Sequence, residues 1–438
     1  EAVNELSDSL DTATALGFVR TLRGVDAQLF AGWRAHAGLL DAPCLASAAA
    51  AAAAAAELAK LGGERARVVI SGCGTSGRVA FLTARRHNAL LAAKNEPPLF
   101  AYAIAGGDAA LLLSDELPED DARAGAAALR AAAAGRRAAL LIGVSCGLSA
   151  PYVAGGLDLA AAAPLAAGFS ATDDGDGGGV VVGAECRYAA FALGFNPVEH
   201  ARAAPLGSGG RTVKDSVAAL RAAEEGGCRW RGVVNPVVGP EAVAGSSRMK
   251  GGSATLLILD AICHAAAAAA RSGAPPPTPA SMAKLLGRGE AAARATYAKA
   301  AEIAAVAELA AAASRGGGKL YYIGEGVAGV VGFIDASEMP DTYGVPFDAV
   351  RAFVCGGWAD VRNDDGELSS KNPLLRLSLA NFEEDILPTL TSRDTIIILG
   401  CGAEPPEEAP AAAPAAADDL AALEAEVDSA PKPRRSRS

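Results

Sequence analysis

Aromatic residues, histidines and paired cysteines are all scarce in this chain of 438 residues. Phe, Trp and Tyr make up 5% of it, and four histidines and eight cysteines are scattered with no Cys-x-x-Cys pair. Because structural zinc sites need clustered Cys and His ligands, we expect no metal site. Isolated cysteines are typical of thiols in a reducing compartment, so we expect a cytoplasmic protein, with a nuclear location as the alternative.

Basic residues and long apolar runs are also few. The chain has 39 Lys and Arg against 50 Asp and Glu, a net charge of −11, which argues against binding to nucleic acid or to an anionic membrane. No run of about 18 strongly apolar residues is evident, and the alanine runs at 48–56 and 265–270 are typical of helices, so we expect no transmembrane helix. The first residue is Glu1 rather than Met, so we expect an incomplete sequence in which a targeting peptide is not assessable.

Apolar runs alternate with helix-like segments through much of the chain. Residues 9–60 predict helix throughout, and 251–314 predict helices broken by a proline-rich turn at 274–277. Strands are predicted at 67–70, 99–104, 138–144, 189–195 and 231–238, with helices at 78–91 and 120–134. This alternation predicts an α/β fold, a parallel sheet covered by helices on both faces. The glycine-rich segment at 173–179 predicts a surface loop.

An internal repeat divides the chain. Three segments, at 72–77, 105–108 and 141–147, recur about 250 residues later at 324–329, 355–358 and 397–402. Three collinear matches at one spacing indicate two copies of one α/β unit. The second copy begins with a strand at 320–323 and stops after about three strands.

The predicted organisation has four parts. A helical segment at 1–60 precedes a first α/β domain at 61–285 and a second, truncated domain at 286–401. Residues 402–438 are rich in Pro, Ala and Glu and end in a basic stretch, which predicts a disordered tail.

The loop at 72–77 fits Gly-x-Gly-x-x-Gly but suits a dinucleotide poorly. A dinucleotide site needs an acidic residue about 20 residues later, at the end of the next strand, and Asp108 comes too late. We therefore expect no cofactor. Hydroxyls at Thr75 and Ser76, at a helix N-terminus, favour a phosphate monoester instead.

A second hydroxyl-bearing loop follows the third predicted strand. It holds Ser145 and Ser149, and Ser149 is a candidate N-cap before Pro151. Because the carboxyl ends of parallel strands share one sheet edge, the two loops are expected to ring one phosphate. The alternative is that each hydroxyl only caps its helix. A third segment, 239–253, carries Arg248 and Lys250 and is expected to touch the same anion.

Five segments together resemble the sugar isomerase (SIS) domain family. They are GCGTSGR (72–78), GVSCGLSAPYVAGGLD (143–158), GFNPVEHAR (194–202), NPVVGPEAVAGSSRMKGGSAT (235–255) and DASEMPDTYG (335–344). Within the family the chain resembles the N-acetylmuramic acid 6-phosphate etherases and, more closely, the glucokinase regulatory proteins. The resemblance covers about residues 15–400. It implies tandem SIS domains, each a parallel sheet flanked by helices, with the second incomplete and the helical lid of the regulatory proteins lacking.

The resemblance also implies the residues of a phosphosugar site. The phosphate loops would contain Gly74, Thr75 and Ser76 from the first loop, and Ser145, Cys146, Gly147 and Ser149 from the second. The remaining contacts would come from Glu119, Arg248 and Glu338.

The two copies differ at these positions. In the second copy Val327 and Ala328 replace the two hydroxyls, and Glu325 adds a negative charge that would repel phosphate. Arg86 stands where the etherases carry their glutamate, and Glu338 of the second copy retains it. We therefore expect one phosphosugar site per chain, flanked by Glu119 and Glu338 if the copies pack face to face.

Two functions from different classes follow. The first is a phosphosugar-binding regulator that senses a hexose or fructose phosphate and controls a sugar kinase. The second is an etherase-like lyase with Glu119 and Glu338 as its acid and base. Glu119 also has a structural alternative as an acid in the first turn of a helix. A third possibility, a phosphosugar isomerase, has no distinctive constellation in this sequence.

Overall fold

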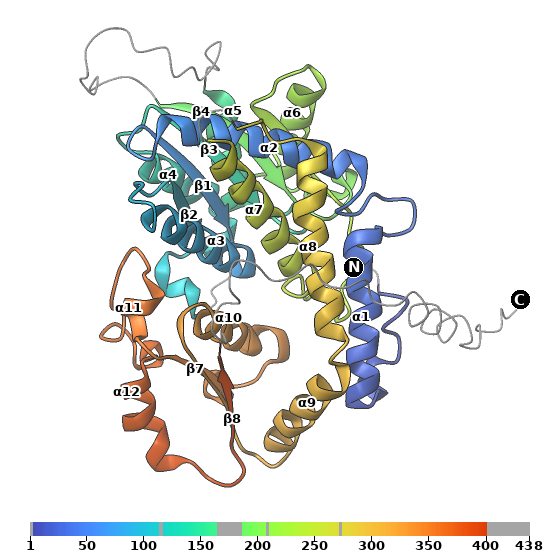
Figure 1. Ribbon diagram of the computed structural model, residues 1–438, viewed down its shortest axis with the longest axis vertical. Coiled ribbons are helices and arrows are strands. Elements are labelled where there is room, and N and C mark those ends of the chain that lie inside the picture. Colours follow the sequence, from blue (N-terminus) through green and yellow to red (C-terminus); the bar gives the residue numbers. More distant parts are fainter. Residues whose placement is uncertain (1–2, 114–116, 164–185, 207–209, 271–273, 401–438) are drawn as a thin grey trace, which may run out of the picture. The chain divides into compact units, whose positions relative to one another are not determined.

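The computed structural model describes residues 3–113, 117–163, 186–206, 210–270 and 274–400 and contains two parallel sheets (Figure 1). The predicted loop at 173–179 and the predicted tail at 402–438 lie outside the described residues. The predicted α/β fold with helix-flanked parallel sheets is confirmed.

Two helices precede the first sheet. They are α1 (Ala15–Ala31), whose N-cap Thr14 accepts the N–H of Gly17, and α2 (Ala42–Leu61). The prediction of helix throughout 9–60 is wrong at 32–41, where Trp33 and His36 form an antiparallel bridge. Gly32, with a φ of 78°, ends α1 in a backbone conformation that other residues rarely adopt.

The first sheet has five parallel strands in the order β2-β1-β3-β4-β5. The strands are β1 (Ala66–Gly72), β2 (Phe100–Ile104), β3 (Ala138–Val144), β4 (Arg187–Leu193) and β5 (Arg231–Val234). All five predicted strands exist, although the fifth ends at Val234 rather than at 238.

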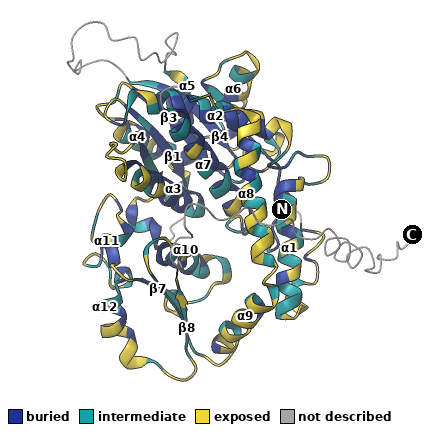
Figure 2. Ribbon diagram, in the orientation of Figure 1, coloured by how far each residue is buried: buried dark blue, intermediate teal, exposed yellow. Residues whose placement is uncertain are grey.

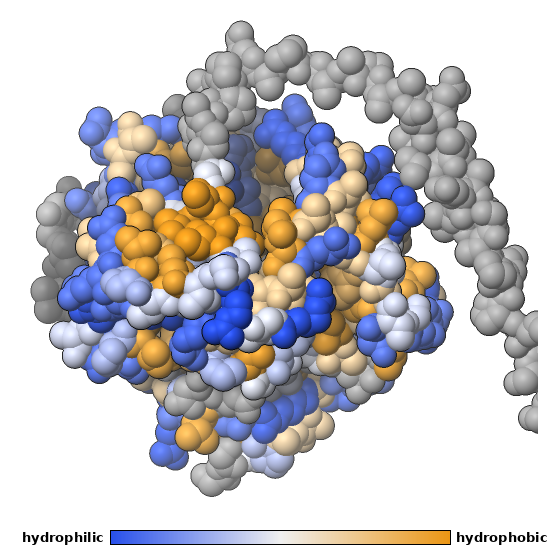
Figure 3. Space-filling model, turned by 90° about the horizontal axis from the view of Figure 1, so that it is seen from below, coloured by the Kyte–Doolittle hydropathy of each residue, from blue (hydrophilic) through white to orange (hydrophobic). Residues whose placement is uncertain are grey.

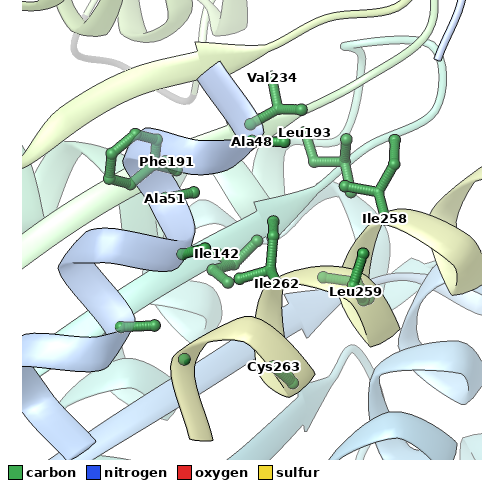
Figure 4. Close-up of a cluster of buried hydrophobic side chains, with 14 of the residues drawn as sticks. Ala48, Ala51, Ile142, Phe191, Leu193, Val234, Ile258, Leu259, Ile262 and Cys263 are labelled. Atoms are coloured by element: carbon green, nitrogen blue, oxygen red, sulfur yellow. The ribbon is translucent and has the colours of Figure 1, made fainter. Parts of the chain in front are cut away.

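Helices cover both faces of this sheet. One face packs against α2, α3 (Gly74–Ala92) and α7 (Lys250–Ala269), and the other against α4 (Ala122–Ala132), α5 (Pro151–Ala162) and α6 (Val213–Glu225). Because strand side chains alternate, Ile142 points to the first face and Leu141 to the second. Figure 4 shows Ile142, Phe191 and Leu193 among residues of α2 and α7. Figure 2 shows the central strands as buried.

Two of the covering helices, α2 and α7, are long and apolar enough to cross a membrane by length and composition alone. This corrects the expectation that the chain has no such stretch. More than half of each apolar window is buried, 56% in α2 and 61% in α7, and the two helices pack on the sheet and on each other. Alanine gives them their hydropathy while leaving room for this close packing.

Two further helices lead to the second sheet, α8 (Pro279–Tyr297) and α9 (Ala300–Arg315). The second sheet is parallel in the order β7-β6-β8, with β6 (Leu320–Gly324), β7 (Val350–Val354) and β8 (Thr395–Leu399). Its helices are α10 (Gly326–Tyr343), α11 (Gly357–Val361) and the short α12 (Leu379–Asn381).

The strand order β7-β6-β8 repeats the order β2-β1-β3, so the two copies inferred from the sequence exist. Among the described residues, which end at Gly400, the second sheet has three strands and no counterpart of β4 or β5, and its incompleteness stays a prediction. Within this described part, β8 lies at the edge of the sheet, and its Ile396 and Ile398 are exposed. Apolar groups lie at the surface beside hydrophilic ones in Figure 3.

The two copies share a buried apolar cluster. Phe81 of α3 and Leu111, after β2, pack with Val330 and Phe333 of α10 and with Trp358 of α11. This packing places α10 against the end of the first sheet where α3 begins.

Candidate functional site

A cavity of about 490 Å³ lies at the carboxyl edge of the first sheet. All ten residues predicted for the phosphosugar site line it, namely Gly74, Thr75, Ser76, Glu119, Ser145, Cys146, Gly147, Ser149, Arg248 and Glu338. The structure thus brings together residues separated by as many as 264 positions. Their roles toward a ligand stay predictions.

The first wall is the turn between β1 and α3. Strands β1 and β3 pair with Gly72 opposite Val144, so the loops that follow them are neighbours. Gly74 has a φ of 48°, which a larger residue would adopt with strain. A Cβ on Gly77 would lie 2.5 Å from Cγ1 of Ile104 and 2.9 Å from the carbonyl oxygen of Gly72. These glycines let the helix start close to the sheet.

The hydroxyls of this turn do not cap α3. Its N-cap is Cys73, which makes no side-chain capping bond. Thr75 donates its hydroxyl to Oε1 of Glu338, and Ser76 Oγ lies 3.5 Å from Sγ of Cys146. The capping alternative is therefore wrong for Thr75 and Ser76, which point toward groups lining the cavity.

The second wall is the loop between β3 and α5. Ser145 Oγ accepts the N–H of Ser149 at 2.9 Å and that of Ala150 at 3.2 Å, so its hydroxyl does stabilise the turn. The prediction that Ser149 is the N-cap is wrong: the N-cap is Ala150, followed by Pro151. Ser149 therefore keeps an exposed hydroxyl beside the cavity.

The cysteine of this loop is a protonated thiol. Burial raises the pKa of Cys146, whose sulfur lies near the hydroxyls of Ser76 and Thr255. Burial also raises the pKa of Cys73, and the nearby carboxylates of Glu119 and Asp120 add to the shift. Neither thiol is therefore suited to act as a nucleophile at neutral pH.

The third wall comes from the second copy. Glu338 of α10 accepts from Thr75 and forms an ion pair with Arg78, whose Nε donates to the carbonyl oxygens of Ala110 at 3.1 Å and Leu111 at 3.0 Å. Arg78 is fully buried.

Arg78, Asp341 and Thr342 also line the cavity and were not predicted as site residues. All three lie inside segments that the sequence already distinguishes, Arg78 at the end of GCGTSGR and the other two in DASEMPDTYG (335–344).

Glu119 lies in a 3-10 helix, Leu117–Asp120, at the edge of the cavity. The next helix, α4, is capped instead by Asp121, which accepts the N–H groups of Arg123 and Ala124. The start of α4 thus does not depend on Glu119 as a capping group. A Cβ on Gly74 would lie 3.4 Å from Oε1 of Glu119, so this carboxylate adjoins the loop 72–77.

The segment 239–253 divides into a cavity part and a buried part. Arg248 lines the cavity, as predicted. Lys250 does not: it is fully buried, and its Nζ donates to Oε1 of Gln28 in α1 at 2.7 Å. The expectation that Lys250 touches an anionic ligand is therefore wrong.

Behind the cavity, Glu241 caps α7. Its carboxylate accepts the N–H groups of Lys250 and Gly251, both at 2.8 Å. Burial raises the pKa of Glu241 to about 7 and lowers that of Lys250 to about 8. Burial also raises the pKa of Asp26, whose carboxylate accepts the hydroxyl of Tyr297. The hydrogen bonds of Glu241 join the two ends of the segment 243–248, which lines the cavity.

Within the described ranges, no group of three or more His, Cys, Asp or Glu side chains is arranged to hold a metal ion. The donors that line the cavity are instead hydroxyls, backbone N–H groups at two helix starts, and the guanidinium groups of Arg78 and Arg248, a set that suits an anion.

Comparison with protein families identifies the two copies. The model of the glucokinase regulatory protein N-terminal SIS domain matches residues 50–161, and that of the glucokinase regulatory protein second SIS domain matches 297–404. The chain belongs to the SIS domain family, in the glucokinase regulatory protein group. The resemblance inferred from the motifs is confirmed, and the predicted domain boundaries stay predictions.

Individual relatives of this SIS chain belong to the same group as the matching family models. It is 33% identical over 406 residues to the glucokinase regulatory protein of Xenopus laevis and 32% identical over 403 residues to that of Homo sapiens. These alignments cover 91% of this chain but 61% and 60% of the relatives, so the chain spans about 60% of their length. An N-acetylmuramic acid 6-phosphate etherase of Symbiobacterium thermophilum is 47% identical over 55 residues, 13% of this chain and 18% of the etherase.

Among solved structures, tagatose-6-phosphate ketose/aldose isomerase from Escherichia coli aligns with a TM-score of 0.40 and 10% identity, over 90% of this chain and 75% of that one.

Proposed function

We propose that this SIS chain binds one phosphosugar in the cavity and that occupancy of the cavity regulates a sugar kinase. The observation that carries the proposal is the convergence of two hydroxyl-bearing loops, Arg248 and Glu338 on one cavity. The names of the glucokinase regulatory proteins that the chain resembles support the kinase as partner.

The cavity has chemistry for both parts of a phosphosugar. The starts of α3 and α5 present N–H groups and hydroxyls, and the helix dipoles favour a phosphoryl group there. The carboxylates of Glu119 and Glu338, which adjoin the first loop, and that of Asp341 are acceptors for sugar hydroxyls. This combination favours a phosphate monoester of a polyol. The net charge of −11 does not oppose it, because the anion site is local.

Titration calorimetry with fructose 6-phosphate tests the binding. We expect one site per chain, and Ser76→Ala should weaken the affinity about tenfold, as expected for loss of a hydrogen bond to a charged group. The matched control is Ser392→Ala, which removes an exposed hydroxyl in the turn before β8 and should leave the affinity unchanged. Two equivalent sites, or no binding of any hexose phosphate, would contradict the proposal.

The kinase part needs its own measurement. The full chain is added to glucokinase with and without fructose 6-phosphate, and glucose phosphorylation is followed. We expect inhibition whose strength depends on the phosphosugar. An identical rate under all conditions would contradict the kinase part of the proposal and leave only phosphosugar binding. A cytoplasmic location, with the nucleus as alternative, stays a prediction.

A second candidate is an etherase-like lyase, and the observation that favours it is that Glu119 and Glu338 line the same cavity. Elimination of lactate from N-acetylmuramic acid 6-phosphate needs one group to take the C2 proton and another to protonate the leaving oxygen. Glu338, however, already accepts from Thr75 and pairs with Arg78. Lactate release that disappears in Glu119→Gln would establish this second function in place of the first.

A further inference from the structure

The side chain of Arg248 is held by residues of the second copy. Its Nη1 lies 3.2 Å from Oδ1 of Asp335, and its Nη2 donates to the hydroxyl of Tyr343 at 3.3 Å. The guanidinium carbon is also 5.6 Å from the centre of the Tyr343 ring. Arg248 lines the cavity, whereas Asp335 and Tyr343 do not. The two α10 residues therefore hold the arginine without occupying the ligand space.

Asp335 is itself restrained. Its Oδ2 accepts the hydroxyl of Tyr322 in β6 at 2.9 Å. Burial raises the pKa of Tyr322, and the charge of Asp335 adds to the shift, so the phenol remains a donor. The result is a chain of contacts from the strand β6 through α10 to the cavity arginine, with each carboxylate oxygen of Asp335 given a separate partner.

One of the three guanidinium nitrogens of Arg248 makes no hydrogen bond in the described part of the chain. This nitrogen, Nε, is buried. The whole side chain is 14% exposed, so solvent reaches it only in part. The guanidinium carries five N–H donors, and the contacts to Asp335 and Tyr343 use two of them. Because the group is held at Nη1 and Nη2 and lines the cavity, its unused N–H groups suit a phosphoryl or sugar oxygen.

We propose that Asp335, oriented by Tyr322, is a positioning residue that fixes the guanidinium of Arg248 for the phosphosugar. The inference rests on the proposed function, since it concerns the same cavity. It makes the second copy part of the binding site through a residue that does not touch the ligand. It also assigns a role to the sheet that has lost its own phosphate-binding hydroxyls.

Calorimetry with fructose 6-phosphate on the full chain tests this role. Asp335→Asn should weaken binding about 5- to 20-fold, and Tyr322→Phe about 2- to 5-fold, the range expected for loss of one charged or one neutral hydrogen bond. Asp335→Glu, which restores the carboxylate, should recover part of the affinity. The control is Asp348→Asn, which breaks the exposed Lys319–Asp348 pair in the same copy and should not change binding.

A double-mutant cycle separates positioning from a general structural effect. Arg248→Lys keeps the charge but lacks the planar fork that Asp335 orients, so it should weaken binding about tenfold. In that background Asp335→Asn should add less than about twofold. An equal weakening in both backgrounds would overturn the inference, because Asp335 would then act through something other than Arg248.

The remaining outcomes are also decisive. Tighter binding by Asp335→Asn would mean that Asp335 competes with the ligand for Arg248, which overturns positioning. Wild-type binding with no effect of Asp335→Asn overturns this inference and leaves the proposed function standing. Absence of binding by the wild-type chain overturns both. Thermal melting of each variant, expected to match the wild type within about 3 °C, confirms that the comparison is made on folded protein.

Discussion

The guanidinium of Arg78 in α3 forms an ion pair with the carboxylate of Glu338 in α10, across the boundary between the two copies. Arg78 is fully buried, and the side chain of Glu338 is only 12% exposed. Removal of one member of such a pair leaves the other charge desolvated without its counter-ion. The pair therefore links the docking of α10 to the start of α3, directly after the loop 72–77.

Glu338→Gln tests the contribution of this pair to stability. Glutamine keeps the shape and one acceptor for Thr75 but removes the charge that balances Arg78. We expect the free energy of unfolding to fall by about 2–4 kcal/mol, measured by urea denaturation. Asp348→Asn, which breaks an exposed pair, should cost less than about 1 kcal/mol. Equal urea midpoints for the two variants would show that the buried pair gives no net stability.

The two serines of the β3–α5 loop should respond differently. Ser145 accepts two backbone N–H groups and lines the cavity, so Ser145→Ala should lower both stability, by about 1 kcal/mol, and fructose 6-phosphate affinity. Ser149 does not cap α5, and Ser149→Ala should lower affinity alone. Thermal melts and calorimetry on both variants provide the comparison. A Ser149→Ala protein that melts as early as Ser145→Ala would contradict it.

The close approach at Gly77 gives a steric prediction. The methyl group of Gly77→Ala would meet Ile104 and the carbonyl oxygen of Gly72, and the latter belongs to the backbone and cannot turn away. We expect a loss of about 1–3 kcal/mol in unfolding free energy. The matched variant is Gly287→Ala in α8, where the added methyl meets nothing within 4 Å, and which should stabilise by about 0.5–1 kcal/mol. The two urea midpoints should move in opposite directions.

The sheet strands and the cavity residues were accessible from the sequence for a simple reason. Continuous apolar runs such as 138–144 are buried on both faces of a parallel sheet, and local pattern alone reveals them. The cavity loops follow those strands directly, so Thr75 and Ser145 were placed at one edge by topology. Asp341 could have been predicted as a cavity residue in the same way, because it lies in the same segment as Glu338.

Contacts with residues far away in the sequence explain why the prediction for Lys250 was wrong. Lys250, two residues after Arg248, was predicted to contact the ligand, but its side chain is buried, where it donates to Gln28 of α1 and is attracted by the carboxylate of Glu241. Nothing local to residue 250 signals a partner more than 200 residues away. The break in the helix after α1, in contrast, could have been predicted locally, because Gly32 and Gly38 flank it and glycine is typical of helix ends.

The buried charges behind the cavity predict how stability depends on pH. The pKa of Glu241 rises from an ordinary value of 4.5 to about 7 because burial disfavours the carboxylate. Between these values the folded protein holds a proton that the unfolded chain has released. The stabilising contribution of Glu241 is therefore complete below pH 4.5 and is lost as the pH rises through 7. Lys250, with its pKa lowered from 10.5 to about 8, contributes in the opposite direction, losing stability as the pH falls from 10.5 through 8.

Glu241→Gln isolates the first of these effects. Glutamine does not titrate and accepts only one of the two N–H groups at the start of α7, so the variant should be less stable than the wild type at pH 5. The difference between the two proteins should shrink by about 1–3 kcal/mol between pH 4.5 and 7, measured by urea denaturation at half-unit intervals. Glu5→Gln, at an exposed position paired with Arg34, should run parallel to the wild type. A Glu241→Gln curve that also runs parallel would mean that Glu241 stays ionised in the folded protein, held by Lys250 and the helix start rather than neutralised by burial.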